Sequence, residues 1–203
     1  VMFKNNQSLV DYYEGFFDLM VNEVGVDGFR ADVARARSLW FWDYFINKHR
    51  DKAWLAESYV TEDASPMANI PRDIPEHLLR VGFDSVYGQF HIFPEWHNAD
   101  SYMNYLEDSY GMLTRAGINK SFIGSFLTHD DPSLMPRGGV LMCLLSAGLM
   151  TTQPWTNPYI LDGFTTGYED RFDIFNFVDR PKGNHPEIGE FLKAMLDLRK
   201  RYI

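Results

Sequence analysis

The stretch GVDGFRADV, residues 25–33, is the part of the sequence that decides the fold. It is typical of the end of a β-strand that brings an arginine and a carboxylate to one site. Strand side chains alternate between two faces, so Arg30 and Asp32 are expected on the same face. The other face, which runs from Phe29 to Val33, is apolar and suited to packing beneath a helix.

This charged pair has two interpretations. Burying an arginine and a carboxylate is costly unless a site uses them. Arg30 also favours the ionised form of Asp32, which a carboxylate nucleophile requires. A structural ion pair at the end of a strand is equally consistent with the stretch taken alone.

Composition limits the class of protein. The chain has 203 residues, 45% hydrophobic and 16% aromatic, which is enough for the core of one domain or a large part of one. It has 19 Lys and Arg against 28 Asp and Glu, a formal net charge of −9, and no basic run, which argues against nucleic acid or an anionic membrane as partner. No apolar stretch is long enough for a membrane span. Cys143 is the only cysteine and is predicted to be an inert buried thiol.

Helical and strand patterns alternate along the chain. Helices are predicted over about residues 9–24, 38–48, 76–80, 99–113, 139–147 and 187–201, and strands over 28–32, 53–57, 83–87, 121–128 and 149–153. Ser8 is the expected cap of the first helix and Gly25 its stop. Such alternation predicts an α/β fold with a parallel sheet built from βαβ units.

Three carboxylates recur at one phase of this pattern, each where a predicted strand ends: Asp32, Glu57 and Asp130. Glu57 follows Asp32 by 25 positions, about one βα unit. Asp130 comes 73 positions later, about two more units with long loops. A (β/α)8 TIM barrel places carboxylates around one mouth in this way. Five predicted strands, where a complete barrel has eight, indicate a partial barrel.

The sequence around these carboxylates resembles the α-amylase family of glycoside hydrolases (glycoside hydrolase family 13). GFRAD at 28–32 is similar to the family's fourth-strand motif, LAE at 55–57 to its fifth-strand motif and FLTHD at 126–130 to its seventh-strand motif. The motifs keep the family's order and spacing. The resemblance implies that residues 1–203 form about the fourth to eighth β/α units of the catalytic barrel. The N-terminal strands and the C-terminal β-sandwich are expected outside this chain, which opens in mid-pattern at Val1.

The resemblance also implies roles. Asp32 would be the nucleophile that forms a covalent glycosyl–enzyme intermediate, and Glu57 the general acid and then the base. Asp130 would hold sugar hydroxyls and help to distort the ring. Arg30 and His129 would support the nucleophile and the bound sugar. A retaining mechanism needs one carboxylate ionised and the other protonated, roughly 5 Å apart. The apolar residues before Glu57 are expected to favour its protonated form.

Two positions depart from the usual pattern. Asp131 doubles the acid after His129, as in some transglycosylating and sucrose-active relatives, so it is a candidate substrate-binding residue. A turn residue before Pro132 is equally consistent with Asp131. Many α-amylases have a Lys-His pair that serves calcium where this chain has Arg35 and Ala36. No metal or cofactor is therefore expected, although calcium is possible.

Aromatic side chains near predicted strand ends are candidates for stacking on sugars, although core or loop packing explains each one more simply. These candidates are Trp96, Trp155, Tyr59 and Tyr87. Trp40 and Trp42 lie on a predicted helix and are expected in the core.

The resemblance implies a retaining α-glycoside hydrolase or transglycosylase that acts on α-glucans or maltooligosaccharides by double displacement. Its partners would be that substrate and the missing N-terminal barrel half, without which the chain alone is expected to be inactive. One alternative is a non-catalytic relative or inactive fragment that serves as a binding or assembly module, against which the three intact carboxylates argue. The other is an unrelated barrel with carboxylates on a metal, but no cluster has ligand spacing.

Overall fold

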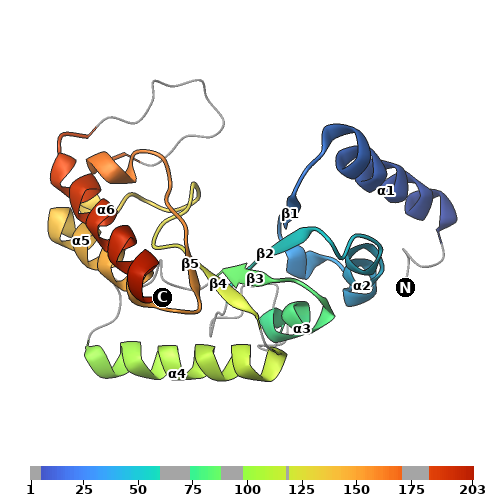
Figure 1. Cartoon of the computed structure of the whole chain (residues 1–203), viewed down its shortest axis with the longest axis horizontal. Helices are drawn as coiled ribbons and strands as arrows, with labels where there is room; N and C mark the ends of the chain where they lie inside the picture. The colour runs from blue at the N-terminus through green and yellow to red at the C-terminus, as the bar shows by residue number, and fades with distance from the viewer. Residues whose placement is uncertain (1–5, 60–73, 88–97, 118, 171–182) are drawn as a thin grey trace. The chain divides into compact units, whose positions relative to one another are not determined.

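The computed structural model describes residues 6–59, 74–87, 98–117, 119–170 and 183–203. Helices and parallel strands alternate along the chain, as predicted (Figure 1). The chain divides into two compact units. The first consists of residues 1–87 and 111–120, and the second of residues 88–110 and 121–203. None of the described helices combines the length and apolar character that a bilayer-spanning helix needs.

The first unit contains three parallel strands joined by helices. Its elements are α1 (Gln7–Leu19), β1 (Gly28–Ala31), α2 (Leu39–Lys48), β2 (Ala53–Tyr59), α3 (Ile74–Val81) and β3 (Ser85–Tyr87). Their order in the sheet is β1-β2-β3, with Phe29 opposite Trp54 and Leu55 opposite Ser85. Two consecutive βαβ connections therefore set the carboxyl ends of these strands at one edge of the sheet.

The first helix begins earlier than predicted. Asn6, not Ser8, is the N-cap of α1, and its side chain accepts a hydrogen bond from the Leu9 amide at 3.1 Å. Ser8 lies inside the helix because an equally good cap residue precedes it by two positions. A π-helical turn over Met20–Val24 extends the helix. Gly25 then ends it, as predicted, with a left-handed φ of 76° that glycine adopts at little cost.

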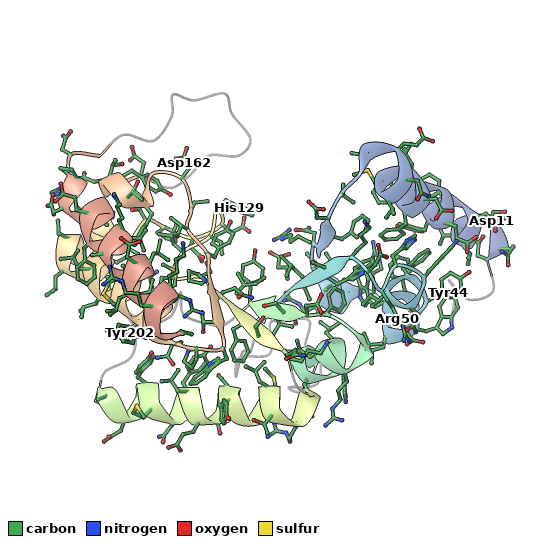
Figure 2. The ribbon with its side chains drawn as sticks, viewed as in Figure 1. Asp11, Tyr44, Arg50, His129, Asp162 and Tyr202 are labelled. Carbon is green, nitrogen blue, oxygen red and sulfur yellow. The ribbon has the colours of Figure 1, made fainter. Side chains whose placement is uncertain are left out.

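An aromatic cluster forms the core of the first unit. The Phe29 ring on β1 lies 5.0 Å from that of Phe17 on α1 and 4.8 Å from that of Trp54 on β2. Figure 2 shows Tyr44 on α2, whose hydroxyl donates to Glu14 on α1 at 2.5 Å. These contacts confirm that the Phe29 face of β1 packs beneath a helix and so turns the opposite face of the strand away from this core.

The second unit contains two strands and two long helices that pack on each other (Figure 1). Its elements are β4 (Ser121–Gly124), α5 (Met135–Thr152), β5 (Thr156–Pro158) and α6 (Pro186–Tyr202), and α4 (Ala99–Ala116) contributes residues to both units. β4 and β5 pair in parallel, with Phe122 opposite Thr156. The predicted strand at 121–128 is shorter in the structure, because the chain turns at Ser125, whose hydroxyl donates to the Leu127 carbonyl at 2.6 Å.

The prediction of a strand at residues 149–153 is wrong. α5 continues to Thr152, and the strand β5 begins only at Thr156. The stretch contains two β-branched residues, Thr151 and Thr152. In the helix their hydroxyls bond back to carbonyls four residues earlier, Thr151 to Ala147 at 2.7 Å and Thr152 to Gly148 at 2.9 Å, which makes them compatible with a last helical turn.

Arg199 of α6 fixes the connection between α5 and β5. Its guanidinium donates to the carbonyls of Thr151 at 3.0 Å, Gln153 at 2.7 Å and Thr156 at 2.6 Å. The last carbonyls of a helix have no partner inside the helix. The Arg199 guanidinium supplies a donor for the Thr151 carbonyl in this last turn. The same guanidinium also binds the first residue of β5.

Candidate active site

The first two predicted catalytic carboxylates come from neighbouring strands. β1 ends at Ala31, directly before Asp32, and Glu57 lies in β2. Ala31 is opposite Ala56 in the parallel register. Asp32 directly follows Ala31, and Glu57 directly follows Ala56. Because Ala31 and Ala56 are paired, the two carboxylates lie at the same edge of the sheet.

Arg30 connects these two carboxylates. One guanidinium nitrogen, Nη1, donates to Asp32 Oδ1, and the other, Nη2, lies 2.8 Å from Glu57 Oε1. The exposed fractions of the side chains are 31% for Arg30, 73% for Asp32 and 10% for Glu57. The predicted pair of Arg30 and Asp32 is thus present, but the carboxylate of Asp32 is exposed. Arg30 also contacts a second carboxylate, that of Glu57, which is largely buried.

Val33 supplies a further hydrogen-bond donor. Its backbone N–H donates to Glu57 Oε2 at 2.7 Å. The prediction that Val33 lies on the apolar face of the strand is wrong, because the chain leaves the strand after Ala31 and Val33 is exposed. Its backbone is left-handed, with φ 44° and ψ 49°. A β-branched residue adopts this conformation only where the surroundings impose it, and here the conformation accompanies the bond to Glu57.

A register shift displaces Glu57 within its own strand. Ala56 is opposite Val86, but Tyr59, three residues on, is opposite Tyr87, the next residue of β3. Bulges of this kind occur beside active sites and redirect a side chain. Glu57 is buried, as the apolar context predicts, but its described contacts are two donors, Arg30 and the Val33 amide. Both donors stabilise a carboxylate.

Tyr87, the last residue of β3, lies against Arg30. The guanidinium carbon of Arg30 is 5.9 Å from the centroid of the Tyr87 ring. Burial acts to lower the pKa of Arg30, but hydrogen bonds to Tyr87 and Asp32 and the charge of Glu57 outweigh it and raise that pKa above its usual value. Arg30 therefore stays charged. Tyr87 is only 4% exposed, so its ring is buried beside Arg30 rather than open to a sugar.

The second unit holds the remaining site residues on the loop after β4, where Figure 2 shows His129. His129 Nε2 lies 3.4 Å from Asp130 Oδ2. Asp131 Oδ2 accepts from the amide of Thr128 at 2.8 Å and from its hydroxyl at 2.9 Å, the geometry of a turn residue. The structure thus brings Arg30, Asp32 and Glu57 together in the first unit. Within the second, it groups His129 with Asp130.

Comparison with known proteins identifies the fold. No profile of a known protein family matches the chain, and no curated protein sequence does. Solved structures do match. A noncanonic maltogenic α-amylase of Thermotoga neapolitana has a TM-score of 0.71 at 21% identity, over 97% of this chain and 44% of its own. A debranching enzyme of Nostoc punctiforme has a TM-score of 0.72 at 17% identity, over 97% and 44%.

An α-amylase of Lactobacillus plantarum also matches, with a TM-score of 0.64 at 20% identity, over 94% of this chain and 49% of its own. The chain has the fold of part of an α-amylase-type barrel. The resemblance in the motifs and the predicted partial TIM barrel are thereby confirmed at the level of the fold. The chain spans less than half the length of each of these structures.

The aromatic candidates can be placed against this barrel, whose mouth is at the carboxyl ends of the strands. Trp155 comes directly before β5, at the opposite end, and its ring packs 5.1 Å from that of Tyr110. Its selection for sugar stacking followed from the misplaced strand and is wrong. Trp96 and the side chain of Tyr59 lie outside the described residues.

The two helical tryptophans take different positions. Trp42 is buried, as predicted, and its indole N–H donates to the Ala34 carbonyl at 2.9 Å. Trp40 is half-buried and stacks on Tyr44 with ring centroids 5.5 Å apart. Both therefore pack against the protein's own elements. Among the described residues, no three His, Cys, Asp or Glu side chains gather as a metal ion would require.

Sequence reasoning missed two contributors to this part of the α-amylase-type barrel. The Val33 amide acts through a backbone conformation that its residue type disfavours. The sequence indicates Tyr87 only as one of several aromatic residues near the ends of predicted strands. Its position in the third of three adjacent strands, one strand beyond Glu57, could have suggested a contact with Arg30 once the sheet order was assumed.

Proposed function

We propose that the protein is a retaining α-glycoside hydrolase or transglycosylase of the α-amylase type. The observation that supports this most directly is the sharing of one guanidinium by Asp32 and Glu57. A retaining mechanism needs two carboxyl groups about 5 Å apart, and a shared Arg30 is compatible with that separation.

In the first step Asp32 attacks the anomeric carbon, and the bond to the leaving sugar oxygen breaks as Glu57 transfers a proton to that oxygen. The product is a glycosyl ester of Asp32. Asp32 suits this role because its carboxylate is accessible and its charge is supported by Arg30. Glu57 must hold a proton here, so we infer that its contact with Arg30 gives way to one with the leaving oxygen when substrate binds.

In the second step Glu57 is a carboxylate that takes a proton from water or from an acceptor sugar. The oxygen so activated attacks the anomeric carbon and releases Asp32. The contacts of Glu57 with Arg30 and the Val33 amide suit this base form.

We assign Asp130 and His129 to the hydroxyls of the bound sugar. Their exposure on the loop after β4 supports this role. Asp131 stays a candidate for substrate contact through the carboxylate oxygen that does not bond to Thr128.

An α-glucan or maltooligosaccharide is the proposed substrate. Structures similar to this chain include a maltogenic α-amylase and debranching enzymes. Because the chain spans less than half of them, activity and substrate are proposed for the whole protein that contains it.

The test is Asp32→Ala in that whole protein. Turnover of α-glucosides should be abolished, because the glycosyl ester cannot form. Added azide should enter the vacated space and yield a β-glycosyl azide. Asp197→Ala, at an exposed position on α6, is the matched control and should keep full activity. Wild-type rates in Asp32→Ala, or an azide product of retained configuration, would remove Asp32 from the nucleophile role. Absence of turnover in the unaltered whole protein would instead favour a non-catalytic barrel.

A further inference from the structure

The two carboxylates do not by themselves fix the position of the Arg30 guanidinium. An arginine side chain has several rotatable bonds, and fixing it costs entropy. Asp32 is 73% exposed and follows the end of its strand, so it offers a weak anchor. Glu57 is better anchored, because it is largely buried and also accepts a hydrogen bond from the Val33 amide.

Among the described residues, Arg30 has a third contact that helps to fix its guanidinium. Tyr87 lies on β3, so Arg30 on β1 reaches across Glu57 on β2 to meet it. Tyr87 is only 4% exposed, so the groups packed around its ring restrict its movement. The guanidinium carbon of Arg30 lies over the ring, 5.9 Å from its centroid, and hydrogen bonding with Tyr87 helps to raise the pKa of Arg30. Both contacts favour a charged, fixed guanidinium.

We propose that Tyr87 is a positioning residue that holds Arg30 between Asp32 and Glu57, so that one guanidinium serves both carboxylates. The proposal rests on the proposed glycosidase function of the same site. In this proposal the role of Tyr87 is to hold Arg30. It acts only through Arg30, and its effect should therefore appear in the ionisation of the two catalytic carboxyl groups.

The register shift in β2 supports this assignment. Glu57 and Ser58 are accommodated between the pairs Ala56–Val86 and Tyr59–Tyr87. Because of the shift, Tyr87 lies opposite Tyr59, which is on the carboxyl side of Glu57 in β2. The guanidinium of Arg30 lies at this end of the strands. Without the shift, the residue opposite Tyr87 would be Glu57 itself.

The experiment compares Tyr87→Phe, which keeps the ring and removes the hydroxyl, with Tyr87→Leu, which removes both contacts. The readout is kcat/KM for an α-glucoside as a function of pH, in the whole protein. We expect a loss of about tenfold for Tyr87→Phe, typical of one hydrogen bond to a charged group, and a larger loss for Tyr87→Leu. The low-pH limb should move to higher pH in both, because Asp32 ionises less readily when Arg30 is displaced.

Tyr44→Phe is the matched control. It also removes a tyrosine hydroxyl that bonds a charged side chain in the first unit. That side chain is Glu14 on α1, so the bond lost joins two helices and lies outside the proposed site. It should lower the melting temperature without moving the pH limbs. Limbs that stay in place in an active Tyr87→Phe protein would overturn the positioning role while leaving the glycosidase function intact. An inactive wild-type protein would instead overturn the proposed function, and this proposal with it.

Discussion

Arg30 meets two carboxylates of very different exposure. Its pair with Asp32 lies largely in solvent, where ion pairs contribute only about 0–1 kcal/mol to stability. Its pair with Glu57 is mostly buried, so loss of Arg30 would leave a buried carboxylate without its charged partner. The residue therefore matters for the placement and charge of the two carboxylates more than for the stability of the exposed pair.

At the same scale, Glu57→Gln tests the acid. The loss of activity should be smallest on activated aryl glycosides, because their leaving group needs no protonation. The limb of the pH–rate profile that reports the acid should vanish. Glu14→Gln, which changes a carboxylate on α1 bonded to Tyr44 and Lys48, is the control. Equal losses on activated and natural substrates before the steady state would count against Glu57 as the acid.

Among the elements, α5, β5 and α6 depend on one another. β5 is three residues long and is polar, Thr156–Pro158, so it has little intrinsic preference for a strand. It pairs with β4 on one side and receives Arg199 at its first residue. The strand therefore exists because its neighbours position it.

We predict that Arg199→Met destabilises the second unit by about 1–3 kcal/mol, because carbonyls at the end of α5 lose their donor. Arg201→Met, an exposed position on the same helix, should change stability little and is the control. Denaturation of the whole protein measures the difference, and amide hydrogen exchange around Thr156 locates it. Equal stability of the two variants would show that the carbonyl contacts contribute nothing.

At the scale of the whole molecule, two helices expose apolar stripes. On α1 the stripe contains Leu9, Tyr12, Phe16 and Leu19, and on α6 it contains Phe191, Leu198 and Tyr202. Their spacing of three, four or seven residues puts each set on one helix face. In a closed barrel such faces are covered by neighbouring helices, and this chain spans less than half of the barrel proteins that it matches.

We therefore predict that the isolated 203-residue chain self-associates or is poorly soluble, and has no glycosidase activity. Supplying the rest of a barrel of this type in trans should improve solubility. Replacing Phe16 and Leu19 by Ser should reduce self-association in sedimentation experiments. Asp11→Ser, an exposed polar position away from that stripe (Figure 2), should not. A monomeric, cooperatively folding chain that hydrolyses an α-glucan unaided would contradict this prediction.

The order of helices and strands, and the residue types at the strand ends, could be predicted from the sequence because they depend on short-range patterns. Apolar periodicity located α2 and α6 to within a few residues, and Gly25 marked its helix end. The motifs around Asp32, Glu57 and Asp130 were sufficient to indicate the barrel, because a carboxylate after an apolar strand lies at the same edge in every βα unit.

Only the tertiary structure decided what each carboxylate contacts. The end of α5, the start of β5, the left-handed Val33 and the shift at Glu57 all depend on hydrogen bonds between residues far apart in the chain. Tyr87 lies far from Arg30 in the chain but meets it in the sheet, where a single strand, β2, separates their strands. Local propensity cannot encode such contacts, since a backbone or side-chain donor finds its acceptor only once the strands are in register.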